Sequence, residues 1–504
     1  MSAGDVGGRL GVRDEGQASD GREPQARQGS HVMMRPEVRS RIIAAATPIA
    51  VGVVVAALPV PAGLTPGAWH YFALFAAVVA GLMAEPLPAA AIGFIGVGLA
   101  ALSRLVVADP GDSLKWALSG FSNGTVWLVF AAFMIALGYE KTGLGRRLAL
   151  SLVRRLGGRT IGLGYAIALA DLAMGPFMPS NTARSAGTIF PIARSIPALY
   201  GSEPGPTARR IGSYLLWTAF ASTAITCSLF ATALAPNLLA IDLVARTTGI
   251  RLSIGEWFAG AWPVGLILIA TLPLLVYLVY PPEVKSSPDV PVWAGRELDK
   301  MGPVSRDEWL MAALAIVAVI VWTTAADAID PSTTALLVVS LMLVTGLISW
   351  QDIVSNWRAW NVFVLLATLV ALSDGLTKVG FIPWFAQGIA GYLGQFSPTV
   401  ATVGLVVAFF LSHYMFASLT AHTVAVLPVV LAAGAAVPGV SVRTLALLLC
   451  YSLGLMGVIT PYATGPAPVY YGSGFLPRLD FWKLGFIFGM LFLAVLLLVG
   501  YPLL

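Results

Sequence analysis

The residues best suited to do chemistry form two polar tripeptides, each placed deep in apolar sequence. Ser180-Asn181-Thr182 lies within the stretch MGPFMPSNTARSAGTIFPI, and Ser418-Leu419-Thr420 lies within HYMFASLTAHTVAVLP. A helix that begins at such a tripeptide presents free backbone N–H groups and the positive end of its dipole, to which the side chains add hydrogen-bond donors. Each tip can therefore bind an anion without a lysine, and two facing tips would hold both carboxylates of one substrate.

Helix capping is the alternative explanation of these side chains, because serine and threonine are preferred at helix N-termini. For one tripeptide alone the two explanations are equally good. Two copies, each paired with an interrupted helix in the same half of the chain, favour a binding site near the bilayer midplane. We therefore predict that Ser180, Asn181, Thr182, Ser418 and Thr420 bind substrate.

Two proline-interrupted helices supply further polar groups. They read TALAPN at 232–237 and TPYATGPAP at 460–468, and they add Asn237 and Thr464 to the predicted substrate-binding residues. His422 follows the second tripeptide closely enough to touch a substrate, but a hydrogen-bonded packing histidine explains it equally well.

Charged residues near the first tripeptide have competing explanations. Asp171 is an acid within an apolar segment and therefore a functional candidate, but a structural pair with Arg184 is favoured. Arg184 could instead neutralise substrate charge or reach toward the cytoplasm. Glu85, beside Pro86, is expected at an interfacial turn.

No metal, cofactor or enzymatic centre is expected. His413 and His422 lack the supporting carboxylates or cysteines of a metal site. The chain offers no nucleophile–base pair and no phosphate-binding loop, so we predict that it is not an enzyme. Cys227 and Cys450 fall in apolar segments and are predicted to be buried free thiols.

The composition excludes a soluble globular protein. Of 504 residues, 57% are hydrophobic and 11% are charged, and the mean hydropathy is +0.82. Many apolar runs approach the roughly 20 residues needed to cross a bilayer, so we predict an all-α polytopic membrane protein. The net charge of +5 comes from cations at the ends of apolar segments, which indicates membrane topology and not a nucleic-acid partner.

About eleven transmembrane helices and two re-entrant hairpins account for the apolar segments. The stretch 143–156 carries arginines among leucines and is expected to lie in the membrane interface. Residues 160–197 and 398–436 carry polar groups and prolines at their centres, which suits hairpins that line a cavity. The expected spans are 42–62, 68–85, 88–107, 125–140, 210–245, 256–280, 308–326, 333–349, 360–374, 441–468 and 481–503.

The two hairpins belong to two inverted repeats. Trp127 opens one repeat with WLVFAAF, Trp360 opens the other with WNVFVLL, and an odd number of spans separates them. Inverted repeats with interrupted helices are a transporter architecture. The predicted organisation is a disordered cytoplasmic tail at 1–40, scaffold helices 1–3 at 41–115, the first repeat at 116–281 with hairpin 160–197, a cytoplasmic loop at 282–307, and the second repeat at 308–504 with hairpin 398–436.

Lysine and arginine set the expected orientation. With the N-terminus in the cytoplasm, most cations fall in loops predicted to be cytoplasmic, and the outside loops keep mainly Arg246, Arg251 and Lys378. Eleven crossings then place the C-terminus outside.

Five segments of the chain resemble the divalent anion/sodium symporter (DASS) family, and the likeness covers roughly residues 45–504. They are LSGFSNGTVWLVFAAFMIALGYEKTGLGRRLAL, MPSNTARSAGTIFPI, ATALAPNLLA, ASLTAHTVAVLP and TPYATGPAPVYYGSGF. The likeness is greatest to the exchanger branch, which includes citrate/succinate and tartrate/succinate antiporters and the chloroplast 2-oxoglutarate/malate translocator. It implies that substrate carboxylates bind the first tripeptide, Ser418, Thr420 and Thr464. It further implies a homodimer in the bacterial plasma (inner) membrane, with a scaffold and an elevator-like transport domain in each protomer.

The chain departs from the sodium-coupled members of that family at two positions. Leu419 stands where they have a second asparagine, and Pro176 stands where they offer a serine oxygen. We therefore expect sodium-independent antiport of di- or tricarboxylates of the succinate, malate, 2-oxoglutarate, citrate or tartrate class. A sodium- or proton-coupled symporter of the same substrates is the alternative.

Overall fold

The computed structural model describes the backbone of residues 36–325 and 328–504, and the side chains of residues 44–325 and 328–504. The chain divides into a short unit, residues 1–42, and a large unit, residues 43–504, to which the features below belong. Most of the predicted disordered tail, residues 1–35, lies outside the described residues. Residues 36–40, which the sequence placed in that tail, are instead helical, because helix α1 begins at Pro36.

The described residues are almost entirely helical, and their one β pairing is an isolated bridge between Arg159 and Ser286. The first half contains α1 (Pro36–Ala57), α2 (Pro66–Ala84), α3 (Ala89–Ser103), α4 (Pro110–Ala117), α5 (Gly124–Thr142), α6 (Leu144–Leu156), α7 (Thr160–Met174), α8 (Phe190–Ser195), α9 (Gly212–Leu229), α10 (Ala235–Thr248) and α11 (Ile254–Val279). The second half contains α12 (Asp289–Met301), α13 (Arg306–Thr324), α14 (Pro331–Val344), α15 (Trp350–Ser355), α16 (Trp357–Lys378), α17 (Phe381–Leu393), α18 (Pro398–Ser412), α19 (Leu419–Ala435), α20 (Val442–Leu455), α21 (Ala467–Gly472), α22 (Arg478–Val495) and α23 (Tyr501–Leu503).

Eight helical segments among the described residues are long and apolar enough to cross a membrane, which makes this a multi-pass membrane protein. Two of them, Thr160–Phe177 and Pro398–Met415, are the first arms of the predicted hairpins. Shorter apolar helices, such as α3 and α14, accompany them. The total of eleven crossings stays a prediction.

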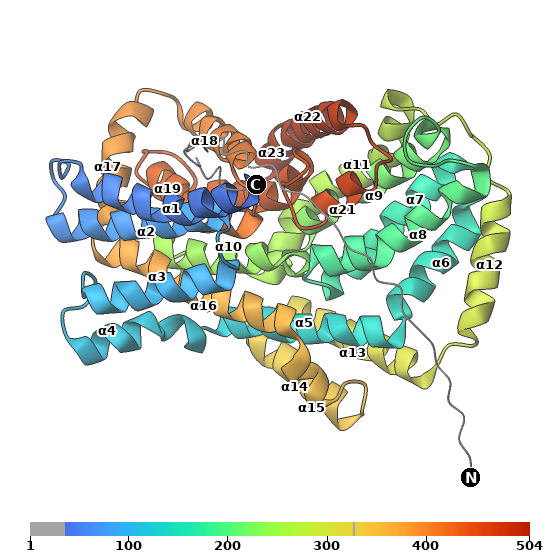
Figure 1. Ribbon diagram of the computed structural model, residues 1–504, viewed down its shortest axis with the longest axis horizontal. Coiled ribbons are helices and arrows are strands. Elements are labelled where there is room, and N and C mark those ends of the chain that lie inside the picture. Colours follow the sequence, from blue (N-terminus) through green and yellow to red (C-terminus); the bar gives the residue numbers. More distant parts are fainter. Residues whose placement is uncertain (1–35, 326–327) are drawn as a thin grey trace, which may run out of the picture. The chain divides into compact units, whose positions relative to one another are not determined.

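Helix α9 lies at the centre of one packed group of helices. All its residues are buried, as expected for a helix that is apolar on every side. It packs against α7, α11 and α20, while α5 packs against α14 and α16 packs against α3. A second group consists of α3, α5, α13, α14 and α16. In Figure 1 these helices lie along the lower side of the view.

The segment predicted as a cytoplasmic loop, residues 282–307, contains a helix that the sequence did not reveal. Helix α12 packs along the amphipathic helix α6, and an ion pair of 2.8 Å joins Arg146 of α6 to Glu297 of α12. Val290, Ala294 and Leu298 recur at helical spacing along α12, and Val290 and Ala294 are buried. With 13 residues and several charges, this helix does not meet the length and composition of a membrane span.

Both predicted hairpins are present, and each bends where its polar tripeptide begins. In the first, α7 ends in a short 3-10 turn, Gly175–Phe177, and the second arm starts after Ser180. In the second, α18 ends in the turn His413–Met415 and α19 starts after Ser418. Each serine caps its second arm, with Ser180 Oγ accepting from the amide of residue 183 at 3.2 Å and Ser418 Oγ from that of residue 421 at 3.3 Å.

The second arms of the two hairpins differ in helix type. The first begins as a π-helix, Thr182–Ile189, whereas the second is the α-helix α19 throughout. Pro191 follows Ser180 by eleven residues, but Pro428 follows Ser418 by ten. A π-helix has more residues per turn than an α-helix, so it accommodates one extra residue in an arm of the same length. The π-helix in the first hairpin therefore accounts for its longer spacing between serine and proline.

Two helices are interrupted, as predicted. The first interruption, residues 230–234, separates α9 from α10, and the second, residues 459–466, separates α20 from α21. Pro236 and Pro466 lie at or near the start of the helices that follow, where a missing N–H leaves no intrahelical bond unmade.

Candidate functional site

The tip of the first hairpin is bonded to the first interruption. Arg184 Nη1 donates to the carbonyl oxygens of Met178, at 2.7 Å, and Ala233, at 2.9 Å. The amide of Ala235 donates to the carbonyl of Pro179 at 3.1 Å. The carbonyls that the bend leaves without helical partners are thus satisfied by one buried side chain and by the chain across the interruption.

Arg184 forms the structural pair that the sequence favoured. Its fully buried side chain donates from Nε to Asp171 Oδ1 at 3.2 Å and from Nη2 to Cys227 Sγ at 3.1 Å. Because its donors are taken up inside the protein, Arg184 supports the tip and does not point a free charge at a ligand. A buried arginine needs such saturation, since an unpaired buried charge is costly.

A buried hydroxyl network extends this pair to the second half of the chain. Thr223 Oγ1 donates to Asp171 Oδ1 at 3.2 Å and lies 2.7 Å from Ser185 Oγ. Ser185 Oγ in turn lies 3.0 Å from the hydroxyl of Tyr470 on α21. The sequence analysis missed Ser185, Thr223 and Tyr470, although polar residues inside apolar helices were the available signal.

One hydrogen bond joins the first tripeptide to the second interruption. Asn181 Nδ2 donates to Thr464 Oγ1 at 2.6 Å, and both side chains are buried. The neighbouring Gly465 lies so close to Thr182 that a Cβ atom there would be 2.1 Å from its hydroxyl oxygen. Three predicted binding residues, Asn181, Thr182 and Thr464, are therefore brought together.

The middle residues of the two tripeptides lie around one small space. Asn181 and Leu419 line the same small cavity, of about 10 Å³, together with Thr464 and Gly454. That volume holds at most one water molecule. A dicarboxylate therefore does not fit between the two tips in this conformation.

The second tip is held by histidines and aromatic rings. His422 is fully buried, its Nε2 lies 2.9 Å from Ser412 Oγ, and its ring packs against Phe409 and Phe416 with centroids 4.5 and 4.9 Å away. His413 Nε2 donates to the carbonyl of Ala463, in the second interruption, at 2.8 Å. These contacts match the packing alternative for His422, and its role in substrate binding stays a prediction.

Asn237 lies away from the cavities and supports the first interruption. Its buried side chain donates from Nδ2 to the carbonyls of Cys227, at 2.7 Å, and Phe230, at 3.2 Å. The contact of Asn237 with substrate stays a prediction. Glu85, by contrast, is confirmed as a turn residue, because it is the left-handed C-cap of α2.

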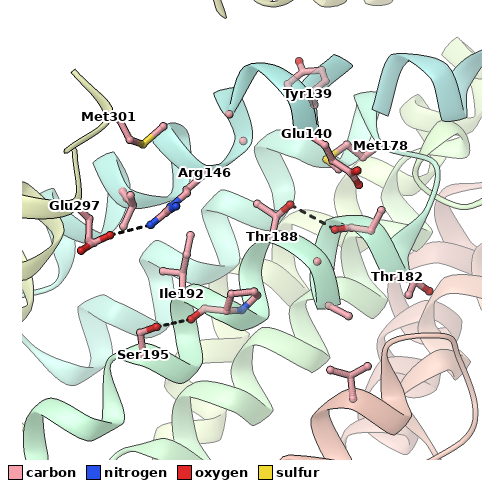
Figure 2. Close-up of a pocket in the computed structure, with 18 of the residues that line it drawn as sticks. Tyr139, Glu140, Arg146, Met178, Thr182, Thr188, Ile192, Ser195, Glu297 and Met301 are labelled. Carbon is pink, nitrogen blue, oxygen red and sulfur yellow. Dashed lines mark hydrogen bonds and ion pairs between the residues drawn. The ribbon is translucent and has the colours of Figure 1, made fainter. Parts of the chain in front are cut away.

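Two larger cavities open beside the first tripeptide. The first, of about 940 Å³, is lined by Thr182 and by residues of α5, α6 and α12 (Figure 2). The second, of about 250 Å³, is lined by Ser180. Ser418 and Thr420 line neither of these two cavities, although both side chains are partly exposed.

A metal centre has no support in the described part of the chain, where no three His, Cys, Asp or Glu side chains come close enough to hold an ion. The site is instead built from hydroxyls, one carboxamide and helix starts. Such neutral donors suit an anion that must also be released.

Paired hairpins and paired interrupted helices inside a multi-pass helical unit define a membrane transporter. The chain belongs to the divalent anion/sodium symporter family, since the model described as the sodium:sulfate symporter transmembrane region matches residues 39–503. It is 46% identical over 470 residues to the citrate/succinate antiporter of Escherichia coli K12, covering 91% of this chain and 96% of that one. It is also 46% identical over 466 residues to the L-tartrate/succinate antiporter of the same strain, covering 90% and 96%.

Two solved structures share the fold at low sequence identity. The YdaH transporter of Alcanivorax borkumensis aligns with a TM-score of 0.53 and 15% identity over 78% of this chain and 88% of its own. MtrF of Neisseria gonorrhoeae aligns with a TM-score of 0.52 and 13% identity over 93% and 95%. Both likenesses show the transporter fold alone.

Proposed function

We propose that this protein exchanges di- and tricarboxylates, of the succinate, malate, 2-oxoglutarate, citrate or tartrate class, across the bacterial inner membrane without sodium. The observation that carries the proposal is the 46% identity, over nine tenths of the chain, to antiporters named for citrate, tartrate and succinate. Because succinate recurs in both names, it is the first substrate to test.

The proposed substrate-binding groups are the two tripeptides and one residue of the second interruption. Ser180 and Thr182 border open cavities, and Asn181 donates to the hydroxyl of Thr464. Ser418 and Thr420 complete the set when the tips separate. The helix starts at both tips add the positive ends of two helix dipoles.

The absence of sodium coupling is proposed from the second tip. Leu419 is buried and lines the small cavity with Gly454 and Thr464, and its place in the second tripeptide corresponds to that of Asn181 in the first. Sodium, as a hard cation, needs several oxygen ligands, and a leucine side chain supplies none. Pro176 likewise has no side-chain oxygen, and its carbonyl already accepts from Thr232 Oγ1 at 2.8 Å.

The proposed orientation places the N-terminus in the cytoplasm and the C-terminus outside. It is supported by ion pairs, each of which joins two helix ends that the predicted topology puts on one side of the membrane. The cytoplasmic pairs are Lys141–Asp352 and Arg147–Glu308, and the outer pairs are Arg246–Asp374 and Arg443–Glu256. The homodimer is proposed from the family resemblance.

Obligatory exchange follows from the electrostatics of an elevator that carries both tips together. An unoccupied site would bring two positive helix ends toward each other with no anion between them. Without sodium to change that field, only a second dianion makes the return step favourable. The Asn181–Thr464 and His413–Ala463 bonds connect both hairpins to the second interruption, which supports movement of the two tips as one body.

The test uses purified protein in liposomes. Uptake of labelled succinate into vesicles preloaded with succinate or malate is expected to be equal in sodium, potassium and choline buffers. Empty vesicles are expected to take up little. An inward sodium gradient that drives accumulation into empty vesicles would overturn exchange and establish a symporter instead.

A further inference from the structure

The two larger cavities share a short stretch of wall that contains two charged side chains. Glu140, near the end of α5, and Arg358, at the start of α16, line both cavities, as does Ala183 beside the first tripeptide. Both charged side chains are exposed. Figure 2 shows Glu140 and Thr182 among the residues around the larger cavity.

The other charged groups of the cavity walls are already paired. Arg146 and Glu297 form an ion pair of 2.8 Å, and Asp352 pairs with Lys141 at 2.6 Å. Within residues 44–325 and 328–504, Glu140 and Arg358 are the charged groups of these walls that have no ion-pair partner.

Arg358 is therefore the one cation of these two cavity walls, among the described residues, that has no ion-pair partner. Arg184 is nearer the tip in sequence, but its donors are committed to Asp171, Cys227 and two carbonyls. The guanidinium of Arg358 lies 5.6 Å from the ring centre of Trp357, which holds it without using its N–H groups. A guanidinium with a free edge binds a carboxylate by two parallel hydrogen bonds.

We propose that Arg358 and Glu140 form an inner capture site for di- and tricarboxylates, distinct from the tripeptide site and preceding it on the cytoplasmic side. This inference rests on the proposed function. Arg358 binds one carboxylate of the incoming substrate, and Glu140, a carboxylate of the protein itself, competes for the same cation. The competition keeps capture weak, so that the substrate moves on to Ser180 and Thr182.

The position of the two residues makes the capture site accessible to substrate that arrives from the cytoplasm. Arg358 and Glu140 belong to α16 and α5, not to either hairpin, and they lie next to the cytoplasmic pair Lys141–Asp352. A substrate arriving from the outside reaches the tips without passing them. Capture therefore affects the Michaelis constant on the cytoplasmic face and leaves the outer face almost unchanged.

The test measures exchange from each face. Everted and right-side-out membrane vesicles are preloaded with unlabelled succinate, and the KM for labelled succinate is measured for Arg358→Gln. We expect KM to rise about tenfold in everted vesicles and less than twofold in right-side-out vesicles, with little change in maximal rate. Glu140→Gln is expected to lower KM two- to threefold in everted vesicles. Arg358→Lys, which keeps the charge but not the two-pronged geometry, is expected to be intermediate.

A matched control separates capture from general surface charge. Arg155 is an exposed arginine of α6 that lines neither cavity, and Arg155→Gln is expected to leave both KM values unchanged. Raising the ionic strength should raise KM for the wild type in everted vesicles and change it less for Arg358→Gln.

The outcomes distinguish this inference from the proposed function. Wild-type vesicles that do not exchange succinate at all overturn the proposed function. Wild-type exchange with an unaltered KM in Arg358→Gln, an equal rise on both faces, or the same rise in Arg155→Gln overturns the capture site alone. If Arg358→Gln does not insert into the membrane, the KM values of Arg358→Lys and Glu140→Gln on the two faces test the capture site in its place.

Discussion

The two hairpins differ most at a pair of positions that flank each tip. Nine residues before the tip serine and four residues after it, the first hairpin has Asp171 and Arg184, which form a buried ion pair. At the same positions the second hairpin has Phe409 and His422, whose rings pack 4.5 Å apart. One backbone plan is thus supported by two different kinds of interaction.

The difference follows from what each tip must bond. Arg184 has enough donors to reach Asp171 and two carbonyls that belong to the bend and the first interruption. The second tip reaches its interruption through His413, the first residue of the turn His413–Met415, so His422 needs only Ser412. A charged pair satisfies more backbone groups, but it is also far more costly to break, because the remaining charge stays buried.

The largest loss of stability is expected when one partner of the buried Asp171–Arg184 ion pair is removed. Arg184→Met leaves Asp171 buried without its partner, which costs about 3–5 kcal/mol. We expect little monodisperse protein after detergent extraction, whereas the double variant Asp171→Leu/Arg184→Met should recover a large part of the yield and thermal stability. Equal yields of the single and double variants would show that the pair is not what supports the tip.

Substitution of the tripeptides themselves should abolish transport and not folding. Asn181→Ala and Thr420→Ala each remove a donor that we propose binds a substrate carboxylate, a loss of roughly 1.5–3 kcal/mol. Succinate exchange in liposomes is expected to disappear in both, with normal membrane insertion.

The matched control for these variants is Ser397→Ala, at the far end of the second hairpin. Ser397 caps α18, accepting from the amide of Val400 at 3.3 Å, and lies at no cavity or tip. It is expected to lose a little stability and keep exchange. Wild-type uptake in Asn181→Ala or Thr420→Ala would mean that the tripeptides are helix caps only.

The second tip should tolerate the loss of its polar bond better than the first. Ser412→Ala removes the hydroxyl that His422 Nε2 meets, at a cost of about 1 kcal/mol. Thermal unfolding in detergent should shift by a few degrees, with the protein still folded. A loss of thermal stability as large as that expected for Arg184→Met would contradict the proposed difference between the two hairpins.

The smallest effect on stability is expected from an exposed ion pair, the one between Lys141 and Asp352. The hydrogen bond from Lys141 is the main cause that lowers the pKa of Asp352 to about 2. A lowered carboxyl pKa stabilises the folded state above its ordinary value near 3.8 and loses that effect as the pH falls toward 2. Asp352→Asn should therefore cost about 0.5 kcal/mol equally at pH 6 and pH 8. A cost that differs between these two pH values would contradict the assignment.

Local signals in the sequence were sufficient for the hairpins and for the interrupted helices. Apolar runs, prolines and two polar tripeptides predicted the hairpins, the interruptions and their repetition, because each depends on residues close together in the chain. The pairing of Asp171 with Arg184 was also foreseeable, since the two residues lie on the two arms of one hairpin. Helix α12 was missed because it is too short and too charged for a membrane span, although its apolar residues recur at helical spacing.

Only the tertiary structure decided which groups meet across the repeats. Asn181 and Thr464 are 283 positions apart, and nothing in either segment specifies the other as its partner. The same holds for Ser185 with Tyr470, and for Glu140 with Arg358 on one cavity wall. The sequence alone determined a membrane transporter and predicted two anion-binding tips. How those tips lie relative to each other depends on how separate helices pack, and packing is fixed by the shapes of surfaces that no local pattern contains.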